Sequence, residues 1–345
     1  MNAVRAEDAF DVARVDTWLK RQLPHLTGTP EVSQFTGGAS NLTYLLRYPG
    51  AELVLRRPPA GHKAASAHDM VREHHVLRAL APAFPLVPAV RALCRDPAVI
   101  GCDFLVMDRV PGVVLRRDPP PGLALDTARA TALSETYVDT LVELHRVDPT
   151  TPGLAELGRG EGYVRRQVEG WTRRYERART PGSPDFAAVT SWLAAHRPAD
   201  TGARVIHNDW RLDNLVLNAD DLRVRGVLDW EMATIGDPLM DLGSALAYWT
   251  EAGDGPAALA ARRQPSHLPG MYTRAQIVAR YCARTGLHAD HWPFYETFGR
   301  FRLAAIAQQI TYRYHHGQTH NPAFRDLPAV VADLHRRCTA AVRAA

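Results

Sequence analysis

The sequence predicts an α+β protein with two lobes: an N-terminal lobe built on an antiparallel sheet and an enlarged helical C-terminal lobe. Strand-like runs dominate the first part of the chain, long helical patterns dominate the rest, and a proline-rich connector separates them. A chain of 345 residues is long enough for each lobe to bury its own core. We therefore expect one domain at residues 1–108 and a second at residues 109–345.

The N-terminal lobe begins with an amphipathic pattern over residues 8–23, which predicts a short helix. Residues 32–57 contain two strand-like runs joined by a Pro-Gly turn, and these predict a β-hairpin. A helical pattern covers Ala67–Leu80. Val99–Met107 is expected to form another pair of short strands around a glycine.

The segment Val110–Pro121 is rich in proline and predicts the connector between the lobes. Beyond it, a strand-and-loop segment at residues 203–231 lies among helical patterns. Those patterns cover residues 125–146, 161–179, 185–196, 241–250, 273–285 and 292–316.

Composition excludes several classes of protein. Hydrophobic residues make up 46% and charged residues 23% of the chain, which is ordinary for a globular protein. No apolar run is long enough to span a membrane, and the early acidic residues do not suit a secretory signal. The four cysteines are scattered, as in a reduced cytoplasmic protein, and no basic block interleaved with aromatics suggests nucleic-acid binding. We expect a cytoplasmic protein without a membrane or nucleic-acid partner, and the oligomeric state stays open.

The strand-and-loop segment contains the pattern His-x-Asp-x-x-x-x-Asn, formed by His207, Asp209 and Asn214. A short apolar run then ends at Asp229, fifteen residues after Asn214. This is the spacing of a kinase catalytic loop. An Asp can accept or orient the proton of an attacking hydroxyl, whereas Asn and a further Asp offer the oxygen ligands that Mg²⁺ prefers. The alternative is a strand–turn–strand in which these residues only close turns.

The segment resembles the aminoglycoside phosphotransferase and choline kinase group of small-molecule phosphotransferases, which have a kinase-like fold. The tripeptide that begins at Asp229 stands where protein kinases carry Asp-Phe-Gly, and residues 233–242 continue in the manner of this group. The resemblance extends over residues 35–249 and is strongest to the branch that includes the kinase-like N-terminal domain of acyl-CoA dehydrogenase fusion proteins. It implies ATP as the phosphoryl donor, Asp209 as the catalytic base, and Mg²⁺ held by Asn214 and Asp229.

Two further segments resemble the nucleotide-binding parts of this family. Gly37 and Gly38 would let the backbone approach phosphate oxygens, and Ser40 and Asn41 can donate hydrogen bonds to them. An ordinary hairpin turn is the alternative for this loop. The strand that contains Met107 resembles the hinge whose backbone binds adenine, and it is expected to be a core strand as well.

The family pattern calls for a basic residue near the end of a strand, paired with a Glu on the next helix. Arg56 stands where protein kinases carry Lys, and Glu73 fits the partner. Arg can clamp phosphates with two hydrogen bonds, but it is not interchangeable with Lys. Strand alternation allows only one of Arg56 and Arg57 to face the nucleotide, and we expect Arg56.

Other polar residues near the motif have less specific roles. Glu231 could reach a second metal ion, contact the substrate or form a salt bridge. His207 is expected to orient the loop, and Asp237 and Asp241 to cap and anchor the following helix. The histidines within residues 315–320 fit no tetrahedral zinc pattern and are expected at a solvated helix end.

The sequence thus predicts an ATP- and Mg²⁺-dependent phosphotransferase that acts on a hydroxyl group of a small molecule. Residues 251–320 contain eight arginines against four acids, which favours a neutral or anionic acceptor such as a hydroxy acid or hydroxyacyl thioester. One alternative is an aminoglycoside-modifying kinase. Another is a nucleotide-binding pseudokinase with a regulatory or scaffolding role, for which Arg56 is the support. A protein kinase is disfavoured because no Ala-Pro-Glu segment follows Asp229.

Overall fold

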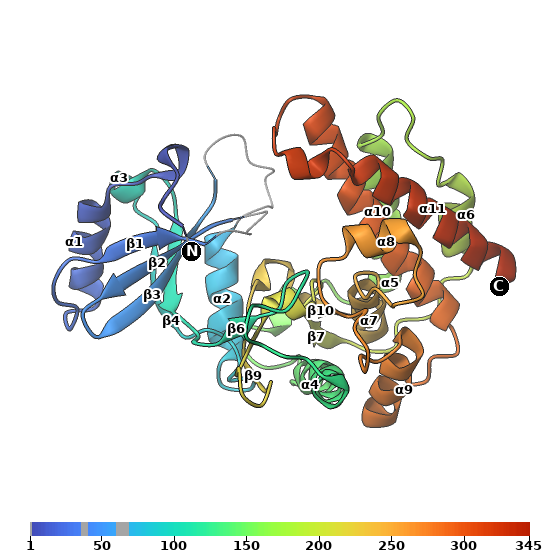
Figure 1. Ribbon diagram of the computed structural model, residues 1–345, viewed down its shortest axis with the longest axis horizontal. Coiled ribbons are helices and arrows are strands. Elements are labelled where there is room, and N and C mark those ends of the chain that lie inside the picture. The colour runs from blue at the N-terminus through green and yellow to red at the C-terminus, as the bar shows by residue number, and fades with distance from the viewer. Residues whose placement is uncertain (1, 36–40, 60–68) are drawn as a thin grey trace. The chain divides into compact units, whose positions relative to one another are not determined.

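The structure, a computed structural model, describes residues 2–35, 41–59 and 69–345. The chain divides into two compact units. One unit, here the sheet unit, comprises Met1–Gly112 and Arg225–Glu231; the other, the helical unit, comprises Val113–Val224 and Met232–Ala345. The predicted α+β class, with an antiparallel sheet near the N-terminus and a helix-rich C-terminal part, is confirmed (Figure 1).

The sheet unit is built on a five-stranded antiparallel sheet with the strand order β1-β2-β3-β5-β4. The predicted hairpin is confirmed, since β2 pairs with β3 and Thr43 lies opposite Arg56. Two short strands, β1 and β4, are absent from the predicted elements because neither has a long alternating pattern. The five strands are β1 (Glu31–Gln34), β2 (Leu42–Tyr48), β3 (Ala51–Arg57), β4 (Val90–Cys94) and β5 (Phe104–Asp108).

Two helices cover opposite faces of this sheet. The predicted N-terminal helix is α1 (Val12–Gln22), which begins at the capping side chain of Asp11 and packs on the face that includes Leu55. The second helix, α2 (Met70–Leu80), contacts Arg56, the next residue of β3. Because neighbouring side chains of a strand point to opposite faces, α1 and α2 lie on different sides of the sheet.

The prediction of two strands within Val99–Met107 is wrong. Only β5 is a strand there, and the preceding residues form a one-turn helix, α3 (Pro97–Ile100). The side chain of Asp96 accepts a hydrogen bond from the Ala98 backbone N–H at 2.9 Å, and Gly101 ends the turn with a φ of 80°. A capping Asp, a Pro at the first helical position and a C-terminal Gly therefore outweigh the apolar residues between them.

The helical unit contains the elements that follow the connector. Five of the six predicted helices are confirmed to within about two residues, and α7 starts three residues early because Asp237 caps it and Pro238 begins it. Two helices, α8 and α11, are not among the predicted elements. The helices are α4 (Thr127–His145), α5 (Tyr163–Arg177), α6 (Ala187–Ala195), α7 (Pro238–Leu246), α8 (Pro256–Ala261), α9 (Arg274–Thr285), α10 (Trp292–His315) and α11 (Leu327–Ala344).

Short strands run between these helices. β6 (Val113–Val114) pairs with β8 (Leu215–Leu217), and β7 (Arg204–Ile206) pairs with β10 (Thr234–Gly236). A further strand, β9 (Val224–Val227), begins in the helical unit and continues into the residues of the sheet unit. The segment predicted as a strand-and-loop region among helices is therefore confirmed.

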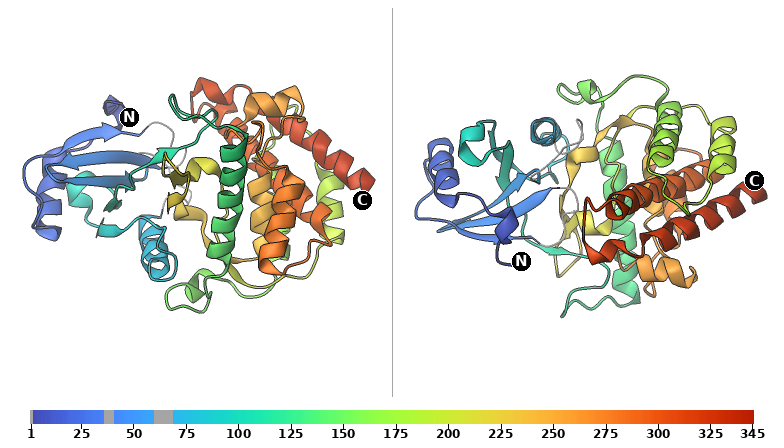
Figure 2. Two further views of the ribbon diagram at one scale, coloured as in Figure 1. Left: turned by 60° about the horizontal axis from the view of Figure 1, so that its bottom comes forward. Right: turned by 90° about the horizontal axis from the view of Figure 1, so that it is seen from above.

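Close helix packing positions the elements that carry the candidate site. α10 and α11 run side by side (Figures 1 and 2), and α4 packs against α9. α7 meets α10 where Gly243 and Gly299 face each other, because a Cβ atom on Gly299 would lie only 2.0 Å from the Gly243 carbonyl oxygen. All four cysteines are free thiols. Within the described ranges, no helix combines the length and apolarity needed to cross a bilayer.

Candidate active site

The predicted catalytic segment starts where β7 ends, in the core of the helical unit. Ile206 is fully buried and lies opposite Thr234 of β10. His207, also fully buried, follows it, and Asn208 has a φ of 65°, which turns the chain sharply. A short 3-10 turn at Leu212–Asn214 then leads into β8.

A single buried carboxylate holds this turn. Asp241 of α7 accepts hydrogen bonds from the backbone N–H groups of His207 at 2.9 Å and Asn208 at 2.8 Å. His145 Nε2 lies 3.1 Å from the same carboxylate, and His145 Nδ1 lies 2.7 Å from the Tyr281 hydroxyl oxygen. Burial alone would raise the pKa of Asp241, but the hydrogen bond with His145 and the nearby backbone N–H of His207 lower it below its ordinary value.

These contacts correct the role predicted for Asp241. Only Asp237 caps α7, by accepting hydrogen bonds from the backbone N–H groups of Leu239 and Met240. Asp241 lies one turn further along the helix, and its carboxylate binds the preceding loop instead. The sequence carries no sign of this contact, because it joins residues 33 and 34 positions apart.

Asn208 is further held by its side chain and its carbonyl group. The Tyr163 hydroxyl donates to Asn208 Oδ1 at 3.2 Å, and Asn208 Nδ2 donates to the Met232 carbonyl oxygen at 3.1 Å. The Arg302 guanidinium donates to the Asn208 carbonyl oxygen at 2.6 Å. Four elements therefore position the residue that directly precedes Asp209.

Asp209 and Asn214 lie together at the end of this loop. Asn214 Nδ2 donates to the Asp209 carbonyl oxygen at 2.8 Å and to Asp209 Oδ2 at 3.1 Å. The Asp209 backbone N–H donates to His207 Nδ1 at 3.2 Å, so His207 does orient the loop. The Asp209 side chain remains 20% exposed and can therefore be reached by a small molecule.

Arg211 and Asp213 complete the polar groups around Asp209, and the motif did not mark either of them. Arg211 forms ion pairs with Asp209 at 3.2 Å and with Asp213 at 3.2 Å, and its guanidinium lies 4.8 Å from the centre of the Tyr248 ring. Burial raises the pKa of Asp213 above its ordinary value. Arg211 thus balances two neighbouring carboxylates on one loop.

In the sheet unit, Arg56 is surrounded by three carboxylates. Its Nε lies 3.1 Å from Glu73, and its terminal nitrogen lies 2.5 Å from Asp229 and 3.6 Å from Glu231. The structure therefore brings together the predicted pair Arg56 and Glu73, and it adds Asp229 and Glu231 to them. Asp229 has a φ of 66°, an uncommon conformation for a residue other than glycine.

Burial and the neighbouring charges shift the pKa values of Glu73 and Arg56 in opposing directions. Burial raises the pKa of Glu73 although Arg56 works to lower it. Burial would also lower the pKa of Arg56, but Glu73, Asp229 and Glu231 together raise it. Arg56 therefore stays a cation between these carboxylates.

Arg57 and Asn41 are two further residues predicted in the sheet unit, and hydrogen bonds hold both. Arg57 points to the other face of β3, donating to the Asp8 carbonyl oxygen at 2.8 Å with its guanidinium 5.5 Å from the Tyr44 ring centre. Asn41 Nδ2 donates to Glu231 at 2.7 Å. The other residues predicted in the phosphate-covering loop lie outside the described residues: Gly37, Gly38 and Ser40.

Met107 lies in β5, the strand predicted as the hinge. It is buried and paired with Val54 of β3 on one side and Val90 of β4 on the other. Strand pairing continues at the next two residues. The backbone N–H of Asp108 donates to the Ala89 carbonyl oxygen at 2.9 Å, and that of Arg109 donates to the Glu52 carbonyl oxygen at 3.1 Å. Met107 is thus a core residue of the sheet, as expected from the sequence.

Asn214 and the carboxylates around Asp229 offer oxygen atoms of the type that Mg²⁺ prefers. Asn214 donates through Nδ2, which orients its amide oxygen away from Asp209. The cluster around Asp229 contains the carboxylates of Asp229 and Glu231, and carboxylate and amide oxygens are what this hard cation prefers. Among the described residues, no three or more His, Cys, Asp and Glu side chains are grouped so that they could hold a metal ion.

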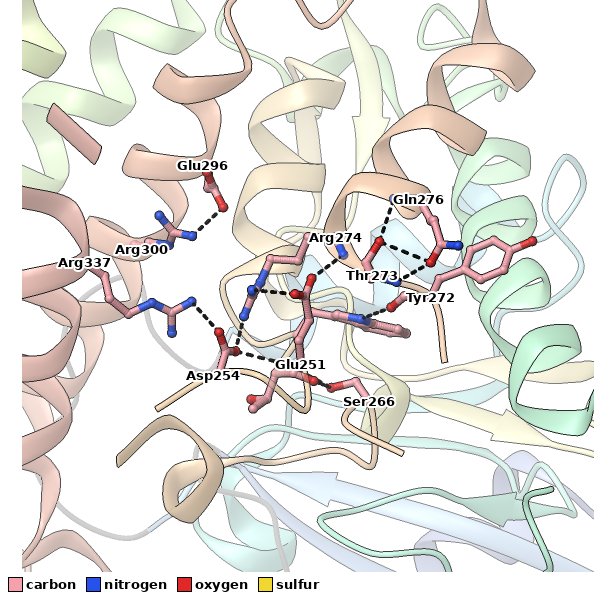
Figure 3. A network of polar contacts seen from close by, with 12 residues as sticks. Glu251, Asp254, Ser266, Tyr272, Thr273, Arg274, Gln276, Glu296, Arg300 and Arg337 are labelled. Carbon is pink, nitrogen blue, oxygen red and sulfur yellow. Dashed lines mark hydrogen bonds and ion pairs between the residues drawn. The ribbon is translucent and has the colours of Figure 1, made fainter. Parts of the chain in front are cut away.

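The arginines of residues 251–320 do not form a free basic surface, which weakens the charge argument for an anionic acceptor. Figure 3 shows Arg274 and Arg300 each pointing at a carboxylate. Five of the eight arginines in this segment form ion pairs: Arg262 with Asp118, Arg274 with Asp254, Arg280 with Asp139, Arg284 with Asp139, and Arg300 with Glu296. A count of charges could not reveal this local neutralisation.

Comparison with known proteins places these features in context. A model of the phosphotransferase enzyme family matches residues 31–277. The chain is 36% identical over 318 residues to acyl-CoA dehydrogenase family member 10 of Mus musculus, covering 91% of this chain and 30% of the relative. It is 32% identical over 324 residues to family member 11 of the same organism, covering 90% of this chain and 40% of the relative. The chain thus spans less than half the length of these relatives.

A solved structure has the same fold over almost the whole chain. It comes from Ralstonia eutropha and carries a provisional assignment as an aminoglycoside phosphotransferase. It is 30% identical, covers 97% of this chain and 99% of its own, and has a TM-score of 0.79. The predicted kinase-like fold is confirmed by this likeness.

Asp241→Asn is expected to destabilise the helical unit by about 2–4 kcal/mol at neutral pH, because one buried acceptor and a buried negative charge are lost. The folded-state pKa of Asp241 lies below its ordinary value of 3.8, so the stabilisation is present above that value and is lost as the pH falls through the folded-state pKa. Urea unfolding of both proteins between neutral and acidic pH would measure the difference, which should narrow toward acid.

Asp290→Asn serves as the control, since Asp290 is exposed. An equal loss of stability in the two variants would contradict the anchoring role of Asp241.

Proposed function

The chain belongs to the phosphotransferase enzyme family, and we propose that it transfers the terminal phosphoryl group of ATP to a hydroxyl group of a small molecule. The observation that carries this proposal is the contact between Asn214 and Asp209, 2.8 Å and 3.1 Å long, on a loop held by a buried carboxylate. It presents a carboxylate and an amide oxygen side by side. These are the two groups that phosphoryl transfer requires next to the acceptor and the metal.

Asp209 orients the acceptor hydroxyl in the proposed reaction. Asn214 and Arg211 hold its carboxylate in one position, which lowers the entropic cost of aligning the hydroxyl with the phosphorus atom. In a loose transition state the hydroxyl proton leaves late, so the carboxylate acts chiefly by orientation and then accepts the proton.

Asn214 and Asp229 would hold Mg²⁺, and Arg56 would contact the phosphates of the nucleotide. Bound Mg²⁺ neutralises the charge that develops on the phosphoryl oxygens. Glu73 keeps Arg56 in place from α2, at 3.1 Å. The Arg56 guanidinium can also donate two parallel hydrogen bonds to a phosphate, which a Lys cannot.

The nucleotide is assigned to the sheet unit in this proposal, as expected for residues 1–108. The loop that contains Gly37, Gly38, Ser40 and Asn41 would cover the phosphates, and the backbone near Met107 would receive the adenine ring. Support comes from the position of Asn41, whose amide contacts the same cluster as Arg56 through Glu231.

The acceptor is proposed to be neutral or anionic, such as a hydroxy acid or hydroxyacyl thioester. Arg211 forms an ion pair with Asp209. The positive charge of Arg263 acts to lower the pKa of Asp213, against the effect of burial. These arginines offset the negative charge of Asp209 and Asp213, which lessens the attraction of the loop for a polycationic acceptor. The likeness to acyl-CoA dehydrogenase family members supports the same choice, although the chain spans only 30% of family member 10.

Asp209→Ala and Asp229→Ala are each expected to reduce phosphoryl transfer by about a hundredfold or more while the protein stays folded, because hydroxyl orientation and metal binding act in the transition state. ADP release with ATP, Mg²⁺ and an active acceptor measures the effect. Asp221→Ala is the matched control, because Asp221 is an exposed turn residue between the two positions. Turnover near the wild-type rate in either folded variant would overturn these assignments.

Arg56→Met is expected to weaken ATP binding about tenfold or more, whereas Arg57→Met leaves it nearly unchanged, because the two side chains lie on opposite faces of β3. Nucleotide titration calorimetry would compare them. Because Arg56→Met leaves Glu73 without its cation, the double variant Arg56→Met/Glu73→Gln tests whether misfolding explains the loss. Equal effects of the two single variants would assign the phosphate contact differently.

Hydroxy acids and hydroxyacyl-CoA thioesters are expected to stimulate ADP release, and kanamycin-type aminoglycosides are not. The physical reason is that Arg211 and Arg263 offset the carboxylates of Asp209 and Asp213, so the loop offers little net attraction to a polycation. Steady-state assays with both panels would decide the acceptor class. Efficient turnover of an aminoglycoside alone would favour the aminoglycoside-modifying kinase, and ATP binding without ADP release across both panels would favour the pseudokinase.

A further inference from the structure

An indole ring flanked by two guanidinium groups lies beside the proposed catalytic loop. Trp171 belongs to α5, and the guanidinium carbon of Arg174, one turn further on, lies 4.6 Å from the centre of its ring. The guanidinium carbon of Arg302, from α10, lies 5.1 Å from the same ring centre. Cation–π attraction holds each arginine to the ring, but it does not cancel the charge of either one.

Arg302 connects this group of residues to the loop. Its guanidinium donates to the Asn208 carbonyl oxygen at 2.6 Å, and Asn208 directly precedes Asp209. Arg302 is only 4% exposed, whereas Arg174 is an exposed side chain. Arg302 thus contacts both the loop and the ring that the exposed Arg174 also contacts.

The two arginines are among those of this unit that form no ion pair with a carboxylate of the described residues. Arg274 and Arg300 each point at a carboxylate (Figure 3), but no Asp or Glu among the described residues forms an ion pair with Arg174 or Arg302. Partial burial, together with repulsion from Arg302 and Arg173, lowers the pKa of Arg174. Two cations on one ring without a counter-charge are costly, and an anionic ligand would relieve that cost.

A residue with an exposed apolar side chain is hydrogen-bonded to Asn208 through its backbone. Asn208 Nδ2 donates to the Met232 carbonyl oxygen at 3.1 Å. Met232 is 41% exposed and is the only large hydrophobic side chain exposed within the described ranges.

We propose that Arg174 and Arg302, arranged around Trp171, form the subsite that binds an anionic group of the acceptor. This inference rests on the proposed function and adds the residues that select the acceptor. The group is a carboxylate or a phosphate, which share the oxygen geometry that a guanidinium binds through paired hydrogen bonds. It comes either from a free hydroxy acid or from the CoA portion of a thioester.

Arg174→Gln is the decisive variant. Among the contacts of the described residues, it is Arg302 and not Arg174 that touches the loop that contains Asp209, so a loss of activity in Arg174→Gln would reflect binding rather than a displaced loop. Arg173→Gln is the matched control, since it removes the same charge from the neighbouring exposed position of α5. Both variants and the wild type would be assayed with short- and medium-chain hydroxy acids, their methyl esters and their CoA thioesters.

We expect Arg174→Gln to lower kcat/KM for the anionic acceptors by about tenfold or more, chiefly through KM, and to leave the methyl esters within about twofold. Loss with the free acids identifies a carboxylate, and loss with the thioesters alone identifies a phosphate of CoA. Equal values for Arg174→Gln and Arg173→Gln, or an equal loss with acids and esters, would overturn the subsite.

Titration calorimetry of the same hydroxy acids and thioesters separates this inference from the proposed function. If wild type releases no ADP with any acceptor, the proposed function fails, and binding that depends on Arg174 but not on Arg173 would still support the subsite. If ADP is released but Arg174→Gln binds every acceptor as wild type does, the proposed function stands and the subsite is wrong.

Discussion

The candidate active site depends on one buried carboxylate that binds two consecutive backbone N–H groups. Asp241 receives them from His207 and Asn208, and His145 approaches it from the other side. A buried carboxylate is costly unless nearly all of its lone pairs are used, so these donors stabilise both the charge and the strained turn at Asn208. Asp209 follows that turn directly, so its position depends on α7 as well as on the contacts within the loop.

The charges of the site are arranged differently in the two units. In the sheet unit, Arg56 contacts the carboxylates of Glu73, Asp229 and Glu231, and a divalent cation is proposed to bind beside them. In the helical unit, the guanidinium groups of Arg174 and Arg302 lie around Trp171. Carboxylate oxygens suit the proposed cation, and guanidinium groups suit the proposed anion.

Family and fold class could be predicted because local signals suffice for them. The spacing of His207, Asp209 and Asn214 led to the phosphotransferase family, which is confirmed, and hydrophobic periodicity led to most of the long helices. The wrong strand prediction and the missed strands both concern short elements. Apolar content suggested strands within Val99–Met107 where capping residues form a one-turn helix, and short polar strands such as β1 gave no periodic signal.

By itself, the sequence determined which residue types are available for phosphoryl transfer and how they are spaced, because a motif is a local property of the chain. Only the tertiary structure decided their surroundings. It directed Asp241 to the loop rather than to its own helix, placed Arg56 and Arg57 on different faces, and paired most arginines of residues 251–320 with carboxylates. Hydrogen bonds and ion pairs act over a few ångströms in space, whatever the separation along the chain, and no count of residues contains that distance.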